Sequence, residues 1–152
     1  MITLKIGDKA PAFTALDQNG NKISLADYGS KKVVLYFYGE AGSPTCTIES
    51  CNLRDNIDSL KHSGYEVIGV SPDNAANQKK FETKYHLPFP LIADTDHVIM
   101  ESYGVWDQKK LFGREYMGVL RTTFVIDENG VIINIFLKPK NKAHAQEILA
   151  AK

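Results

Sequence analysis

Apolar residues in this chain fall into short runs, and the first two runs have the pattern of a small hairpin. Residues 12–16 and residues 22–25 alternate between apolar and polar positions, and the Gln-Asn-Gly-Asn segment at 18–21 is typical of a tight turn between strands. The β-branched and aromatic run at residues 32–38 has no polar face, which indicates a strand buried on both sides. We therefore expect an N-terminal hairpin followed by a central strand.

A helix is predicted directly after the central strand. Turn residues at 39–42 end the strand, and Ser43-Pro44 supplies an N-cap hydroxyl and a proline at the first helical position. One helix face is apolar, with the positions i, i+4 and i+7 occupied by Leu53, Ile57 and Leu60. The His-Ser-Gly sequence at 62–64 is typical of a helix end, so a single helix is expected between these signals.

The remaining runs continue the alternation of strands and helices and place a second hairpin near the C-terminus. In chain order they first predict a strand at 65–70, a helix from Ser71-Pro72 to about His86, and a connector at 87–93 that ends in a short strand. A brief helix at 97–103, strands at 121–126 and 131–137 around a turn at 127–130, and a helix at 143–151 are predicted to follow. This order is that of a thioredoxin-like α/β fold with an N-terminal β-hairpin extension. Right-handed crossovers make the first two core strands parallel.

The composition describes one globular domain over residues 1–152. Hydrophobic residues make up 43% of the 152 positions, and 18 Lys+Arg balance 18 Asp+Glu to a net charge of zero. A neutral chain has no overall field that attracts nucleic acid or an anionic membrane. The longest apolar runs fall far short of the ~20 residues of a membrane-spanning helix, and the first residues lack the pattern of a secretory signal. We expect a cytoplasmic protein with no nucleic-acid or membrane partner.

Cys46 is the first candidate for chemistry, because it lies in the first turn of the predicted helix. Unpaired backbone N–H groups and the helix dipole favour an anion there, and the thiolate is the reactive form of cysteine. A small buried hydrophobic residue is the alternative interpretation. Open α/β sheets bind ligands where the carboxyl end of a strand meets a helix N-terminus, which favours a reactive Cys46.

Cys51 is the only other cysteine, and it forms a C-x4-C pair with Cys46 rather than the C-x-x-C of thioredoxins. In a continuous α-helix the two Cα atoms would lie about 8.6 Å apart, whereas a disulfide joins Cα atoms at roughly 4.4 to 6.8 Å. A bond between the two thiols therefore requires the helix to unwind locally. In a reducing compartment such a pair is catalytic, redox-active or simply buried more often than it is a structural disulfide.

Metal and cofactor sites are not expected. A structural zinc site needs four ligands, and no paired ligand spacing exists among the histidines, which are His62, His86, His97 and His144. Residues 39–44 lack the Gly-Lys-Ser/Thr ending of a nucleotide-binding loop. We interpret each histidine as a surface or hydrogen-bonded residue, and the lysine pairs at 79–80 and 109–110 as solvated faces without a function.

Spaced blocks of sequence run through nearly the whole chain, and together they match one family. The blocks are Tyr-Phe-Tyr at 36–38, Ser-Pro-Thr-Cys-Thr at 43–47, Cys51, Arg54-Asp55, Leu-Pro-Phe-Pro-Leu at 87–91, Tyr-Gly-Val at 103–105, and Arg-Thr-Thr-Phe-Val-Ile-Asp at 121–127 with Gly130. This set resembles the peroxiredoxins, specifically the bacterioferritin comigratory protein or Q-type subgroup. The resemblance implies a thiol-dependent peroxidase that serves antioxidant defence.

The family's active-site motif is Pro-x-x-x-Thr/Ser-x-x-Cys, and it corresponds to residues 39–46. Gly39 stands at the proline position, and Thr45 stands where the subgroup often has glycine. The resemblance implies that Cys46 is the peroxidatic nucleophile, which is oxidised to a sulfenic acid. It also implies that the Ser43 hydroxyl holds the peroxide.

The resemblance assigns supporting roles to three further residues. Arg121 would hold both the thiolate and the polarised O–O bond, since a guanidinium stays charged and presents several donors in one plane. Glu49, one turn after Cys46, would orient Arg121, and an ordinary exposed helix carboxylate is the alternative. Cys51 would be the resolving cysteine, which condenses with the sulfenic acid into an intramolecular disulfide.

The implied partners are a hydroperoxide substrate and thioredoxin or a similar thiol reductant, and the subgroup resemblance favours a monomer. Two other functions remain open. A thiol-disulfide oxidoreductase is disfavoured by the missing C-x-x-C and by Thr122, where thioredoxins carry a proline. A redox-sensing or chaperone-like binding module would use the same two thiols without turnover.

Overall fold

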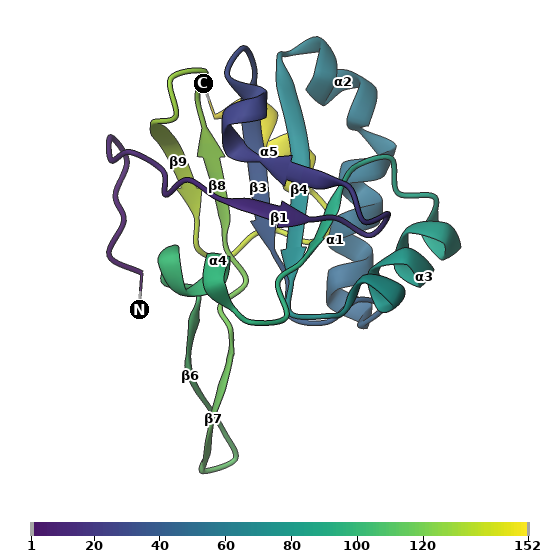
Figure 1. Ribbon diagram of the computed structural model, residues 1–152, viewed down its shortest axis with the longest axis vertical. Helices are drawn as coiled ribbons and strands as arrows, with labels where there is room; N and C mark the ends of the chain where they lie inside the picture. The colour runs from purple at the N-terminus through teal and green to yellow at the C-terminus, as the bar shows by residue number, and fades with distance from the viewer. Residues whose placement is uncertain (1, 152) are drawn as a thin grey trace.

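The computed structural model describes residues 2–151, and its centre is a five-stranded mixed sheet (Figure 1). The strands lie in the order β5-β4-β3-β8-β9, with the bounds Leu91–Ala93, Tyr65–Ser71, Lys32–Phe37, Thr123–Ile126 and Ile132–Phe136. β3 runs parallel to β4, and β4 parallel to β5, whereas β8 is antiparallel to both β3 and β9. The expected parallel pair and the C-terminal hairpin are both confirmed.

β3 is the central strand, and both of its faces are buried as predicted. Alternate side chains belong to two separate hydrophobic clusters, because successive residues of a strand point to opposite faces. One cluster contains Val33, Leu35 and Phe37, and the other contains Val34, Tyr36 and Tyr38. A single strand therefore joins the two layers of the core.

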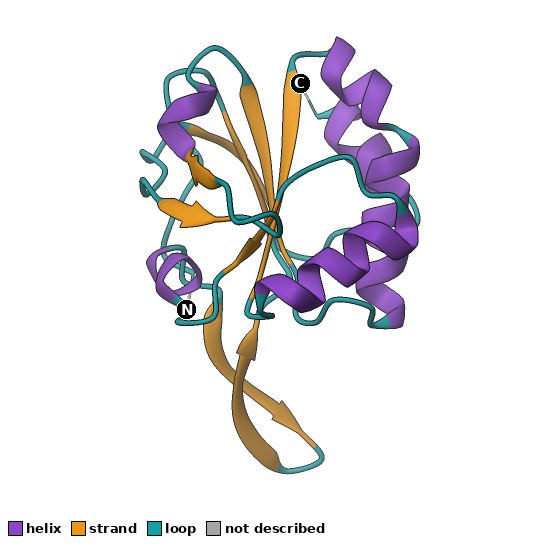
Figure 2. Cartoon of the chain, turned by 45° about the vertical axis from the view of Figure 1, so that its right-hand side comes forward, coloured by secondary structure: helices purple, strands orange, loops and turns teal. Residues whose placement is uncertain are grey.

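Four α-helices of the described chain cover one face of the sheet, and the N-terminal segments together with α4 cover the other (Figure 2). The helical layer consists of α1 (Pro44–Asp55), α2 (Ile57–His62), α3 (Ala75–Tyr85) and α5 (His144–Ala150). The opposite layer holds the predicted hairpin of β1 (Thr14–Leu16) and β2 (Lys22–Ser24), the 3-10 helix η1 (Leu25–Tyr28) and α4 (Val98–Ser102). The predicted thioredoxin-like α/β fold with an N-terminal hairpin is confirmed.

Two predicted helix boundaries are wrong. The expected single helix after Ser43 divides at Asn56, which leaves the helical backbone with φ −114° and ψ 15° and donates a side-chain hydrogen bond to the Asn52 carbonyl at 2.8 Å. The next helix begins at Ala75, not at Ser71-Pro72, because the Asn74 side chain accepts the capping hydrogen bond from Asn77 N at 2.8 Å.

One hairpin of the structure is absent from the sequence-based prediction. β6 (Trp106–Leu111) pairs with β7 (Arg114–Val119), and the two strands project from the body of the molecule (Figure 1). Their turn is formed by Phe112 and Gly113, which both have positive φ, at 52° and 77°. This hairpin forms one wall of the candidate active site.

Candidate active site

Cys46 lies in the first turn of α1, directly after the loop that leaves the central strand. Pro44 occupies the first helical position as predicted, and the Cys46 side chain is 3% exposed. Ser43 stands at the N-cap position, but within the described chain its hydroxyl makes no capping hydrogen bond, so this detail of the prediction is wrong. The hydroxyl of Ser43 is therefore available to a ligand, beside the helix N-terminus that favours an anion.

Three segments that are distant in sequence meet at a cleft of about 430 Å³. The α1 segment contributes Ser43 and Cys46, and the connection between β7 and β8 contributes Arg121. The missed hairpin contributes the other wall with Lys109, Tyr116 and Val119. The interpretation of Lys109 as part of a merely solvated face is wrong, because its ammonium donates to the Val119 carbonyl at 3.1 Å and its side chain lines the cleft.

The loop at residues 39–42 is held in place by an aspartate. Asp73 accepts a hydrogen bond from Ala41 N at 2.7 Å and another from the Ser71 hydroxyl at 2.7 Å. Gly42 has a φ of +88°, which favours glycine at this point of the loop. Asp73 therefore fixes the loop beside Gly39, the position at which the peroxiredoxin motif has proline.

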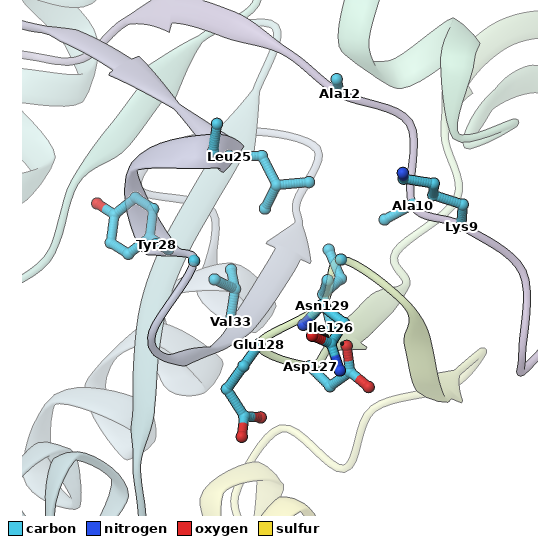
Figure 3. Close-up of a pocket in the computed structure, with 13 residues that line it drawn as sticks. Lys9, Ala10, Ala12, Leu25, Tyr28, Val33, Ile126, Asp127, Glu128 and Asn129 are labelled. Carbon is cyan, nitrogen blue, oxygen red and sulfur yellow. Dashed lines mark hydrogen bonds between the residues drawn. The ribbon is translucent and has the colours of Figure 1, made fainter.

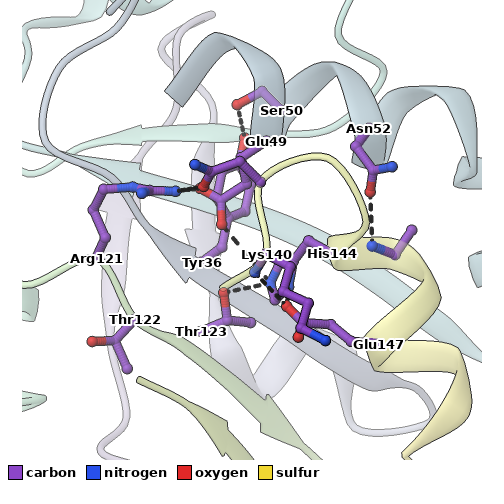
Figure 4. Close-up of polar contacts among 12 residues, drawn as sticks. Tyr36, Glu49, Ser50, Asn52, Arg121, Thr122, Thr123, Lys140, His144 and Glu147 are labelled. Atoms are coloured by element: carbon purple, nitrogen blue, oxygen red, sulfur yellow. Dashed lines mark hydrogen bonds and ion pairs between the residues drawn. The ribbon is translucent and has the colours of Figure 1, made fainter. Parts of the chain in front are cut away.

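Arg121 and Glu49 form an ion pair behind the cleft (Figure 4). Arg121 Nη2 donates to Glu49 Oε1 at 3.1 Å and also to the side-chain oxygen of Asn141. Glu49 is fully buried, so the alternative of an ordinary exposed helix carboxylate is wrong. Burial raises the pKa of Glu49 to about 7, although Arg121 opposes that rise.

This raised pKa predicts an unusual dependence of stability on pH. Between the ordinary value of 4.5 and about 7, the folded chain binds a proton at Glu49 that the unfolded chain does not bind. The contribution of Glu49 to the free energy of unfolding therefore rises as the pH falls through this window, by about 1.4 kcal/mol per unit. Urea unfolding of the wild type and of Glu49→Gln at several pH values measures this contribution to the free energy of unfolding.

On acidification from about pH 7 to about pH 5, the wild type should gain about 2 kcal/mol of unfolding free energy relative to Glu49→Gln. Burial lowers the pKa of His144, which has the opposite effect on stability, but this residue is present in both proteins and its contribution largely cancels. Parallel pH profiles of the two proteins would show that Glu49 titrates normally.

Cys51 lies farther along α1, and both cysteines are free thiols. The helix is continuous from Pro44 to Asp55, so the structure is that of the reduced, wound form. Cys51 is partly buried, and this burial raises the pKa of its thiol although Arg54 opposes the effect. A disulfide with Cys46 is not compatible with this helix without local unwinding.

The other features of the described residues do not compete with this cleft. Among residues 2–151, no group of three His, Cys, Asp or Glu residues is arranged to hold a metal ion. No helix in that range is long and apolar enough to cross a membrane. A separate hollow of about 290 Å³ is lined by Lys9, Tyr28 and Val33 and by the β8–β9 turn (Figure 3). It lies at the start of β3, whereas Cys46 follows the end of that strand.

Comparison with known proteins agrees with this geometry. Residues 6–135 match the sequence profile of the AhpC/TSA family. The chain belongs to this family. As a peroxiredoxin of the Bcp type, it is 44% identical to the putative peroxiredoxin bcp of Haemophilus influenzae, over 98% of this chain and 96% of that protein. It is 43% identical to peroxiredoxin Bcp of Bacillus subtilis, over 97% of this chain and 94% of that protein.

Solved structures show the same similarity for the fold of this peroxiredoxin. Peroxidoxin BcpB from Mycobacterium tuberculosis superposes with a TM-score of 0.86 at 33% identity, covering 97% of this chain and 96% of that chain. Peroxiredoxin Q from Xanthomonas campestris superposes with a TM-score of 0.88 at 25% identity, covering 99% of this chain and 95% of that chain. The predicted resemblance to the peroxiredoxins is confirmed.

Proposed function

We propose that this peroxiredoxin reduces hydrogen peroxide and organic hydroperoxides with Cys46 as the nucleophile. The observation that carries the proposal is that Cys46, Ser43 and Arg121 line one cleft at the N-terminus of α1. The Ser43 hydroxyl makes no capping hydrogen bond there. An anionic sulfur, a hydroxyl and a permanent cation together suit a substrate that is a polarisable O–O bond.

In the first step the Cys46 thiolate attacks the distal oxygen of the hydroperoxide. An S–O bond forms, the O–O bond breaks, and the enzyme is left with a sulfenic acid while the other oxygen leaves with the electron pair. That oxygen takes up a proton and departs as water or an alcohol. Arg121 and the backbone N–H groups of the first helical turn stabilise the negative charge as it spreads over sulfur and the two oxygens.

In the second step the Cys51 thiolate attacks the Cys46 sulfenic sulfur, an S–S bond forms as the S–O bond breaks, and the hydroxide that leaves takes up a proton to become water. Thioredoxin or a similar dithiol then reduces the disulfide by thiol–disulfide exchange. Both thiols belong to one chain, so the cycle is complete in a monomer. Free thiols of this kind suit a reducing compartment, and we expect the enzyme to serve antioxidant defence in the cytoplasm.

Formation of this disulfide should release the start of α5. Asn52 follows Cys51 and joins α1 to α5, because its side-chain oxygen accepts from Ala145 N at 2.8 Å and its amide donates to the Lys142 carbonyl at 3.0 Å. Local unwinding of α1 breaks both contacts. Oxidation by one equivalent of peroxide should therefore lower the far-UV helix signal and speed hydrogen exchange at the Ala145 amide.

The control for this prediction is Cys51→Ser, which stops at the sulfenic acid and should keep wild-type exchange at Ala145 after the same treatment. The amides of the central strand β3 report whether the rest of the fold is intact in each sample. An oxidised wild type whose helix signal and Ala145 exchange both stay unchanged would contradict the proposed unwinding.

The experiment that tests the function is peroxide-dependent oxidation of thioredoxin, itself kept reduced by its reductase and NADPH. Steady turnover that depends on peroxide supports the peroxidase. Oxidation of a single equivalent per chain indicates a sensor or binding module, and disulfide reduction that needs no peroxide indicates a thiol-disulfide oxidoreductase. These outcomes separate the proposal from the two alternatives.

A further inference from the structure

A buried histidine lies directly behind the ion pair of the active site. His144, in the first turn of α5, is fully buried, and its Nε2 lies 3.9 Å from Glu49 Oε2 (Figure 4). That carboxylate oxygen has no hydrogen-bond partner among residues 2–151, although the other oxygen of Glu49 accepts from Arg121. A buried polar atom without a protein partner is rare and calls for an explanation.

The imidazole ring of His144 is fixed on both edges. Nδ1 lies 2.6 Å from Glu147 Oε1, and Nε2 lies 2.8 Å from the Thr123 hydroxyl. Glu147 Oε1 also accepts from Lys140 N at 2.8 Å, so it acts as an acceptor and places the ring proton on Nδ1. Nε2 is then unprotonated, so it accepts from the Thr123 hydroxyl and packs beside Glu49 Oε2 at 3.9 Å without a hydrogen bond. The ring cannot rotate without losing one of these contacts.

We propose that His144 is a positioning residue for the peroxidase reaction: its fixed ring confines the Glu49 carboxylate so that Oε1 faces Arg121. This inference rests on the proposed function, because it requires Arg121 to act on the peroxide. Phe136 packs against the imidazole in a T-shaped arrangement, with ring centroids 5.3 Å apart, and so also restricts the ring.

The segment that leads into α5 supports Arg121 in two ways. Asn141 accepts directly from Arg121 Nη2, and His144 acts through Glu49. Arginine is a long side chain with many rotamers, so holding it in one orientation before substrate arrives removes an entropic cost from the reaction. Loss of either support should leave Arg121 in the cleft but less often in the reactive orientation.

The test compares two reactions of the same thiol in His144→Asn. The asparagine amide takes the place of Nδ1 beside Glu147 and leaves the space next to Glu49 empty. We expect the single-turnover rate constant of Cys46 with hydrogen peroxide to fall about tenfold, since misplaced catalytic groups commonly cost this much or more. Alkylation of Cys46 by iodoacetamide needs the thiolate but no polarised O–O bond. Its rate constant should therefore change less than about twofold.

Two further variants keep the test decisive. Ile148→Ala removes buried apolar volume from the same helix and changes neither His144 nor Glu49, so it reports the effect of loosening α5. Glu147→Ala alters a residue near the surface and should fold normally. It removes the contact to His144 Nδ1, and we expect the rate constant of Cys46 with peroxide to fall about threefold. The proposal is overturned if His144→Asn reacts with peroxide at the wild-type rate, or if Ile148→Ala loses as much peroxide reactivity as His144→Asn.

Arg121→Lys separates this inference from the proposed function. If this variant loses peroxide reactivity while His144→Asn does not, the peroxidase site stands and only the role of His144 fails. If neither variant changes the reaction of Cys46 with peroxide, the assignment of Arg121 fails, and the inference about His144 fails with it.

Discussion

Replacing Cys46 by serine is expected to abolish peroxide reduction. A serine hydroxyl does not ionise near neutral pH, and oxygen cannot be oxidised as sulfur is, so no sulfenic acid forms and no later step can begin. Cys51→Ser should still consume one equivalent of peroxide per chain and then stop in the absence of another thiol. Peroxide consumption and the thioredoxin-coupled assay measure both results.

The two cysteine variants control for each other. Each exchanges one sulfur for one oxygen within the same helix, and both side chains are at least partly buried, so any general effect on folding should appear in both. Only the identity of the nucleophile separates them. Wild-type turnover in Cys46→Ser would move the chemistry to another residue, and sustained thioredoxin-dependent turnover in Cys51→Ser would show that Cys51 is not required for resolution.

Elements with strong local signals were predictable from the sequence. The central strand has an uninterrupted apolar run, and it is buried on both faces in the structure. The hairpin at Asn19-Gly20 depends on turn residues, and the helix start depends on Pro44 at the first helical position; both preferences are intrinsic to the backbone. In each case a few neighbouring residues specify the element, so no knowledge of distant contacts is needed.

Elements that depend on tertiary contacts or on a less familiar turn were missed. Half of the residues in β6 and β7 are polar or charged, so these strands lack a regular apolar alternation, and their turn uses Phe112-Gly113 rather than Asn-Gly. Asn56 also gives no strong break signal in a sequence pattern, because its effect depends on the hydrogen bond to Asn52. Propensity alone does not decide such positions.

The residues of the candidate site also divide into those that local sequence predicts and those that depend on tertiary packing. Ser43 and Cys46 belong to one local motif, and the position of Cys46 in the first helical turn indicated chemistry before any family was considered. Arg121 is indicated only by the resemblance, since a single arginine before a strand has no distinctive pattern. The prediction that His144 is a surface or hydrogen-bonded residue is confirmed by its two hydrogen bonds. Its position behind Glu49 is a property of how α5 packs on α1.

Arg121→Lys is expected to slow the oxidation of Cys46 by peroxide about 100-fold, a loss typical of removing one donor that stabilises transition-state charge. The Arg121 guanidinium uses Nη2 to bind Glu49 and Asn141 and has further N–H donors, while its side chain lines the cleft. A lysine ammonium is a single charged point, so it cannot keep the Glu49 contact and present a planar set of donors to sulfur and oxygen. Single-turnover stopped-flow mixing with hydrogen peroxide measures the rate constant.

Arg54→Lys is the matched control, because Arg54 lies on α1 but its guanidinium binds Asp55 and the Tyr85 carbonyl at 2.9 and 2.7 Å. This variant makes the same chemical change close to the reactive helix and should keep the wild-type rate within about twofold. An equal loss of rate in both variants would indicate a general effect of exchanging arginine for lysine near α1, and not a role specific to Arg121. Wild-type oxidation of Cys46 in Arg121→Lys would show that the helix N-terminus and Ser43 suffice to activate the peroxide, and that Arg121 serves only to neutralise the buried Glu49.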